Sequence, residues 1–115
     1  MITLKDIIAV VATEYKMSPE HLMERTRRPA VARPRQIVMW IAREYTKLSL
    51  PQIGERLGGY DHTTIMYGIK VIQVSMSKDP TLEVRVRQLA ALSASRAARR
   101  ERGHGVPINE IAASA

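Results

Sequence analysis

The side chains best suited to specific hydrogen bonding stand together at residues 61–64, with the sequence DHTT, directly after the glycine-containing stretch 58–60. A carboxylate accepts hydrogen bonds, an imidazole donates or accepts them, and threonine carries a hydroxyl beside a methyl group. Bases in the major groove of duplex DNA present matching groups, such as the cytosine N4 donor and the thymine methyl. These residues therefore indicate a surface that reads bases. A simpler interpretation is that Asp61 and Thr63 cap a helix while His62 is an exposed surface residue.

The same side chains do not fit enzyme chemistry. Adjacent residues on one helix point about 100° apart, so Asp61, His62 and Thr63 cannot relay a proton as a hydrolytic triad does. The other carboxylates are scattered along helical patterns, and the three histidines lie far apart in the sequence. Cysteine is absent, which excludes disulfides and cysteine-ligated zinc. We expect no catalytic residue, no metal site and no cofactor, and we predict that the protein is not an enzyme.

The charge balance favours a polyanionic partner. Lysine and arginine number 18 against 11 acidic residues, which gives a formal net charge of +7. So basic a chain suits nucleic acid or an anionic membrane surface; a soluble basic protein without such a partner is the alternative. No stretch approaches the ~18 apolar residues of a membrane span, and the N-terminus lacks the pattern of a secretion signal. We expect a cytoplasmic, nucleoid-associated protein without membrane contact, bound to double-stranded DNA as a monomer, although its oligomeric state stays open.

The elements that must position these residues are helices. Apolar residues recur at helical spacing from Leu4 to Tyr15, and Ser18 begins a second, short helix. Five arginines and two prolines interrupt the pattern between residues 25 and 35. Pro34 is the expected start of a third helix, with Trp40 on its buried side. Strand signals are weak throughout, so the predicted fold class is all-α, in a small helical domain.

Two short helices joined by a glycine turn form the centre of the expected fold. Ser49 and Gln52 fit a capping box at the start of one helix, and Gly58 ends that helix. Asp61 then caps the next helix, with Ile65 on its buried face. This is the helix-turn-helix pattern, in which the first residues of the second helix meet base edges in the major groove.

The chain is expected to divide after residue 78. Residues 1–78 would form the DNA-binding domain, residues 79–102 a C-terminal basic helix, and residues 103–115 a flexible tail. The last helix is suggested by Leu82, Val86, Leu89 and Leu92. The arginines of the C-terminal helix leave three roles open: phosphate contacts, contacts with a partner, or solvation of the helix.

Residues 58–65, with the sequence GGYDHTTI, resemble the signature of the C-terminal DNA-binding domain of the bacterial replication initiator DnaA. That signature reads Gly-Gly, a basic residue, Asp-His-Thr-Thr and an aliphatic residue. Residues 32–36 (ARPRQ) and 49–54 (SLPQIG) match the family at its spacing, and the resemblance covers residues 4–76. It implies a small helical domain with a helix-turn-helix of the DnaA C-terminal, Trp-repressor-like kind, which binds duplex sites called DnaA boxes.

The resemblance also implies roles for individual residues. The residues that would contact bases come from the recognition helix, the helix before it and the arginine loop: Asp61, His62, Thr63, Arg27, Pro51 and Met66. The residues that would hold the phosphate backbone are Arg35, Gln36, Arg43 and Thr64. A proline-bearing arginine loop suits a narrow minor groove, which is where Arg27 would lie. Phosphate contacts position a protein without reading sequence.

Three positions depart from the family pattern. Tyr60 stands where the family has a basic residue, Pro29 occupies a loop position that is often basic, and Trp40 replaces a small residue. These changes bear on affinity more than on binding mode. The chain also contains no phosphate loop of the form GxxxxGK[ST], so it lacks the initiator's ATPase module, and we expect a free-standing protein rather than an excised domain.

The sequence thus predicts sequence-specific binding of double-stranded DNA at DnaA-box-like sites, which would modulate replication initiation or transcription. The alternative is a protein-interaction adaptor that kept the fold and binds an acidic partner through the arginine loop and the C-terminal helix. Salt dependence and sequence preference on duplex DNA separate the two.

Overall fold

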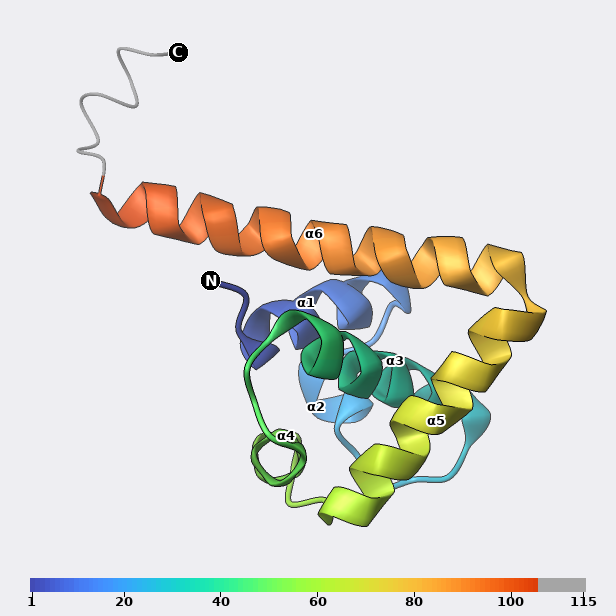
Figure 1. Cartoon of the computed structure of the whole chain (residues 1–115). Helices are drawn as coiled ribbons and strands as arrows, with labels where there is room; N and C mark the ends of the chain where they lie inside the picture. The colour runs from blue at the N-terminus through green and yellow to red at the C-terminus, as the bar shows by residue number, and fades with distance from the viewer. Residues whose placement is uncertain (106–115) are drawn as a thin grey trace.

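The computed structural model describes residues 1–105, and these residues form six helices and no strand, which confirms the all-α prediction (Figure 1). The helices are α1 (Leu4–Glu14), α2 (Pro19–Leu22), α3 (Pro29–Tyr45), α4 (Leu50–Arg56), α5 (His62–Lys78) and α6 (Pro80–Gly105). None of them is both long and apolar enough to cross a membrane.

Most helix starts are specified by residues close in sequence. Thr3 and Ser49 each accept a hydrogen bond from the amide three residues on, and Asp6 and Gln52 complete the two capping boxes. Asp61 accepts from the amide two residues further on and caps α5. Such caps satisfy amide groups that have no partner inside the helix. The predicted capping box at Ser49 and the predicted cap at Asp61 are both confirmed.

The third helix begins earlier than the sequence predicted. Pro29 occupies its first turn, where a missing N–H costs nothing, and Pro34 lies inside the helix rather than at its start. An internal proline removes one helical hydrogen bond. The helix continues through it because Val31 and Ile37 are buried on either side, and tertiary packing supplies most of a helix's stability.

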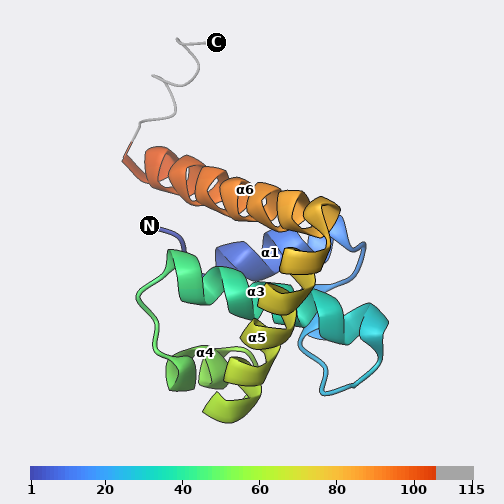
Figure 2. The same ribbon diagram turned by 45° about the vertical axis from the view of Figure 1, so that its right-hand side comes forward.

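The core lies around α3, which contacts each of the other five helices (Figure 2). In both ribbon views α1 and α6 lie on one side of α3, while α4 and the start of α5 lie on the other. Ile37 and Ile41 of α3 are fully buried, as are Ile65 and Ile72 of α5. Trp40 is also buried in this cluster, as its spacing predicts.

The last helix belongs to the same core. Val86, Leu89 and Ala90 are buried, and α6 packs along α1. Leu92, one of the four apolar residues that suggest this helix in the sequence, is 53% exposed. The buried stripe passes through Ser93, whose hydroxyl donates to the Leu89 carbonyl at 2.8 Å. The helix continues to Gly105, beyond residue 103 where the sequence suggested a flexible tail, and the rest of that predicted tail, residues 106–115, lies outside the described residues.

One buried charge joins the first and last long helices. The Asp6 carboxylate, which is fully buried, accepts hydrogen bonds from Arg96 at 2.5 Å, from Arg100, and from the Thr3 amide and hydroxyl at 2.9 Å each. Burial alone would raise the pKa of Asp6. The hydrogen bonds from Arg100, Thr3 and Arg96 together outweigh it and hold the pKa well below its ordinary range. Asp6 is therefore ionised at neutral pH and ties α6 to α1.

Candidate nucleic-acid interface

A tight glycine turn connects α4 to α5 and places the start of α5 at one end of the molecule (Figure 1). Gly58 and Gly59 have φ values of 124° and 86°, which residues with a side chain rarely adopt. The amides of Gly59 and Tyr60 both donate to the Gly54 carbonyl, at 2.9 Å and 2.8 Å, and so close the end of α4. The result is the predicted helix-turn-helix, with its second helix starting at the protein surface.

The first turn of α5 presents all of residues 61–64 to solvent. Asp61 Oδ1 accepts from the Thr63 amide and from the Thr63 hydroxyl, at 2.7 Å each, and these bonds lower the pKa of Asp61. His62 Nδ1 lies 3.5 Å from the same oxygen. The Thr63 hydroxyl hydrogen is thus used locally, which leaves its oxygen and methyl group to meet a base. Capping and base reading are therefore compatible at this turn.

Three segments distant in sequence line one cavity beside the recognition helix. The lining combines the arginine loop, α3 and α5, and consists of Arg27, Ala32, Arg35, Gln36, Thr63, Thr64 and Tyr67. The structure thus brings together five of the ten predicted contact residues. The other five, Asp61, His62, Pro51, Met66 and Arg43, do not line this cavity and are exposed around it or elsewhere on the surface.

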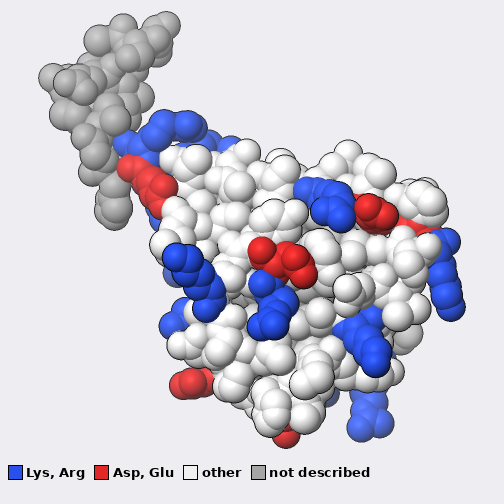
Figure 3. All heavy atoms as spheres, in the orientation of Figure 1, with Lys and Arg blue, Asp and Glu red and all other residues white. Residues whose placement is uncertain are grey.

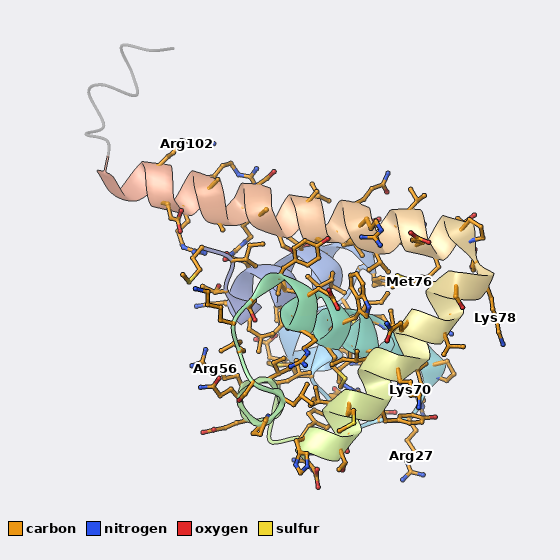
Figure 4. The ribbon with its side chains drawn as sticks, viewed as in Figure 1. Arg27, Arg56, Lys70, Met76, Lys78 and Arg102 are labelled. Carbon is orange, nitrogen blue, oxygen red and sulfur yellow. The ribbon has the colours of Figure 1, made fainter. Side chains whose placement is uncertain are left out.

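The arginine loop lies between α2 and α3, at residues 23–28, and carries Arg27 at its outer side. Figure 4 shows the Arg27 side chain extending away from the ribbon, below α5. Lys70 lies above Arg27 on α5, and Lys78 lies at the far end of the same helix. Figure 3 shows further lysine and arginine side chains spread over the molecule in this view, with acidic side chains fewer, some beside basic ones and others alone at the lower edge. This side of the molecule therefore suits a polyanion.

The Arg35 side chain is not exposed in the way expected of an arginine that binds a phosphate. Its side chain is 7% exposed, with Nη1 donating to the Glu24 carbonyl at 2.5 Å and Nη2 to the Thr26 carbonyl at 2.8 Å. The guanidinium is thereby used to hold the arginine loop. Among the other predicted phosphate contacts, Gln36 is half-buried in the cavity wall, whereas Arg43 is exposed in the last turn of α3.

Two predicted base contacts are exposed apolar side chains outside the first turn of α5 with its cap (residues 61–64), which is called here the recognition turn. Met66 is 51% exposed on α5, and Pro51 is exposed in the first turn of α4. Tyr67, which the sequence reasoning did not select, is 66% exposed and lines the cavity. Its position one helical turn beyond Thr63 was the available signal, since residues four apart share a helix face. Lys70 is exposed further along the same face of α5, and the sequence analysis did not select it either.

Comparison with known proteins gives a consistent result. The family model for the bacterial DnaA protein helix-turn-helix matches residues 4–72, more than half of the chain. The chromosomal replication initiator protein DnaA of Nitrobacter hamburgensis is 43% identical over 88 residues, which is 76% of this chain and 18% of that protein. The protein of the same description from a Caulobacter species is 42% identical over 81 residues, which is 70% of this chain and 17% of that protein.

A solved structure of a DNA replication initiation factor has the same fold. It aligns with a TM-score of 0.73 and 22% sequence identity, over 81% of this chain and 28% of that chain. The present chain thus spans less than a fifth of the length of the curated relatives described above.

Proposed function

The chain belongs to the bacterial DnaA helix-turn-helix family, and on that premise we propose that it binds double-stranded DNA at DnaA-box-like sites. The first turn of α5 enters the major groove, and Arg27 enters the adjacent minor groove. Occupation of such sites modulates replication initiation or nearby transcription. One observation carries the proposal. Arg27 of the arginine loop, Gln36 of α3 and Thr64 of α5 line the same surface cavity, so the three segments meet at one place.

The proposed contacts follow the two chemical classes of protein–DNA interaction. Bases are contacted by the exposed residues of the recognition turn and its surroundings: Asp61, His62, Thr63, Arg27, Pro51 and Met66. The phosphate backbone is held by Gln36, Arg43 and Thr64. Arg35 is assigned to the loop rather than to a phosphate, because the residue is buried and both of its terminal nitrogens, Nη1 and Nη2, donate to loop carbonyls. We propose that the protein binds as a monomer and acts by occupancy, without a cofactor or a catalytic step.

Loss of a base-reading side chain is expected to weaken specific binding selectively. We expect His62→Ala or Thr63→Ala to cost ~1–3 kcal/mol on the preferred duplex, the range for losing one good base contact. Binding to an unrelated duplex should hardly change, since phosphates supply that affinity. A preferred duplex is first selected from a random library, and fluorescence anisotropy then measures both affinities for each variant.

Gln73→Ala provides the matched control, because Gln73 is exposed on α5 but lies well beyond the recognition turn. Equal weakening on both duplexes by His62→Ala and Thr63→Ala would show that these residues do not read bases. A folded sample that binds no duplex at low salt would exclude DNA binding and favour the adaptor alternative.

Arg27 and Arg43, the two arginines among the proposed DNA contacts, are expected to affect binding in different ways. Arg27→Ala should lower affinity and relax sequence preference at one end of the site, where a minor-groove arginine contacts the DNA. Arg43→Ala should weaken all sequences alike and reduce the salt-dependence slope by about one unit. Titrations of a set of single-base variants of the site, at several salt concentrations, measure both effects. The reverse pattern, with Arg43 controlling preference, would contradict the groove assignment.

A further inference from the structure

Three side chains join the arginine loop to the turn of the helix-turn-helix: Arg25, Arg35 and Tyr60, together called here the loop clamp. Two guanidinium groups lie near the Tyr60 ring, whose centroid is 5.1 Å from Arg25 Cζ and 5.2 Å from Arg35 Cζ. Both distances are within the range of cation–π attraction. The Tyr60 hydroxyl lies 3.2 Å from the carbonyl oxygens of both Met23 and Glu24, so its one hydrogen is shared between these two acceptors. Tyr60 thus reaches from the turn into the loop.

Arg25 makes the return connection, from the loop to the turn. Its Nη2 donates to the carbonyl oxygens of Gly58 and Gly59, at 3.2 Å and 2.5 Å. Gly59 has a φ of 86°, and a Cβ added there would lie 3.0 Å from Arg25 Nη2. Arg25 therefore lies close against the glycine turn that connects the two helices.

Arg35 adds the third segment, because it bonds from α3 to the Glu24 and Thr26 carbonyls. The Glu24 carbonyl also accepts from the Thr26 amide at 2.9 Å, and the Thr26 hydroxyl accepts from the Arg28 amide at 3.2 Å. The backbone is held at residues on both sides of Arg27. The Arg27 side chain extends outward from this anchored loop (Figure 4), and the neighbouring Arg28 is exposed as well.

We propose that the loop clamp is a positioning device that fixes Arg27 relative to the recognition turn, with Tyr60 as its central residue. This inference rests on the proposed function, since it concerns how two DNA contacts are kept in register. A loop ordered before binding loses less conformational entropy when the complex forms. Two contacts on one rigid body also act together, because the first brings the second to its target. Tyr60 contributes to affinity through Arg27 rather than through a contact of its own.

A double-mutant cycle tests this dependence. In the otherwise unchanged protein, Tyr60→Leu should weaken binding to the selected duplex about tenfold, within the range of couplings between residues of one network. In the Arg27→Ala background the same change should weaken binding by less than about twofold, because the side chain that the clamp positions is gone. Tyr60→Phe, which keeps the ring and loses the hydroxyl, should fall between Tyr60→Leu and the unchanged protein. Tyr45→Leu, at the half-exposed end of α3, is the matched tyrosine control and should leave affinity unchanged.

Hydrogen exchange on the free protein provides a readout that does not involve DNA. Tyr60→Leu should accelerate exchange of the Glu24, Thr26 and Arg28 amides about tenfold, while the buried amides of α3 keep their protection. Uniform acceleration would mean a loss of overall stability and would overturn the proposal. Unchanged exchange in the loop would overturn it too. Tyr60→Phe serves in the same experiment if the leucine variant does not fold.

The two failures can be told apart. Equal effects of Tyr60→Leu with and without Arg27 would overturn the clamp while leaving DNA binding intact. A chain that binds no duplex would refute the proposed function. Local acceleration of loop exchange in that chain would still support the clamp as the device that holds the loop.

Discussion

Asp6→Asn should lower the free energy of unfolding by about 3 kcal/mol, at the lower end of the effect of removing one partner from a buried ion pair. The carboxylate is fully buried and bonds to both Arg96 and Arg100, whereas the two arginine side chains are 38% and 40% exposed. Those arginines regain part of their hydration when the charge is removed, which is why we expect the lower end. Asparagine keeps the shape of the side chain and an acceptor oxygen for Thr3. Its amide nitrogen then replaces the oxygen that accepts from the two arginines, so the change removes the charge together with those two hydrogen bonds. Denaturant unfolding at pH 7 measures the effect.

Arg99→Ala is the control for this substitution. Arg99 is exposed on the same helix, and the part of the chain that the structure describes gives it no ion pair. Its removal should change stability by less than about 0.5 kcal/mol, as surface substitutions usually do. Equal stabilities of wild type and Asp6→Asn would show that the buried charge does not hold α6 in place.

The same carboxylate makes stability depend on pH in a defined direction. Because the folded pKa of Asp6 lies below its unfolded value of about 4, the stabilisation is fully present above that value. It is lost as the pH falls through the unfolded value toward the folded one. The Asp6→Asn variant should therefore show a flatter decline than wild type when unfolding is followed from about pH 5 to pH 2. Parallel curves would contradict the assignment of this acid sensitivity to Asp6.

Gly54→Ala should disrupt the helix-turn-helix itself. A Cβ at this position would overlap the Tyr60 carbonyl oxygen and lie 3.3 Å from Ile65 Cγ1. The overlapped atom belongs to the backbone, so it cannot be relieved by turning a side chain. We expect a loss of about 3 kcal/mol in stability, the upper part of the usual range for overpacking. Because the Tyr60 peptide leads directly into the recognition turn, duplex affinity should also fall at least tenfold.

Unfolding midpoints and duplex titrations of Gly54→Ala check both parts of this expectation. Glu55→Ala, the exposed neighbour in α4, is the control and should leave both quantities nearly unchanged. A Gly54→Ala protein with wild-type stability and affinity would mean that the turn adjusts freely and that its geometry does not position α5.

Several features of this protein follow from the sequence by itself. The caps at Ser49 and Asp61, the glycine turn and the all-helical class are correct because they depend on residues a few positions apart. Short-range hydrogen bonds and helical periodicity are visible in a linear sequence. The family signature at residues 58–65 is local in the same sense, and the family match agrees with it. The start of α3 was misplaced because two prolines both suited a helix start, and only the burial around Pro34 decides between them.

Other features were decided by the tertiary structure alone. Arg35 was predicted to contact phosphate but lies buried against the arginine loop, and Tyr60 joins that loop to a turn more than thirty positions away in the sequence. Asp6 meets Arg96 and Arg100 near the other end of the described chain. An arginine, a tyrosine or an aspartate has the same local pattern whether it is solvated or bonded. Its partner is fixed only when packing brings distant segments together, because the cost of burying a polar group is met by bonds that no local pattern contains.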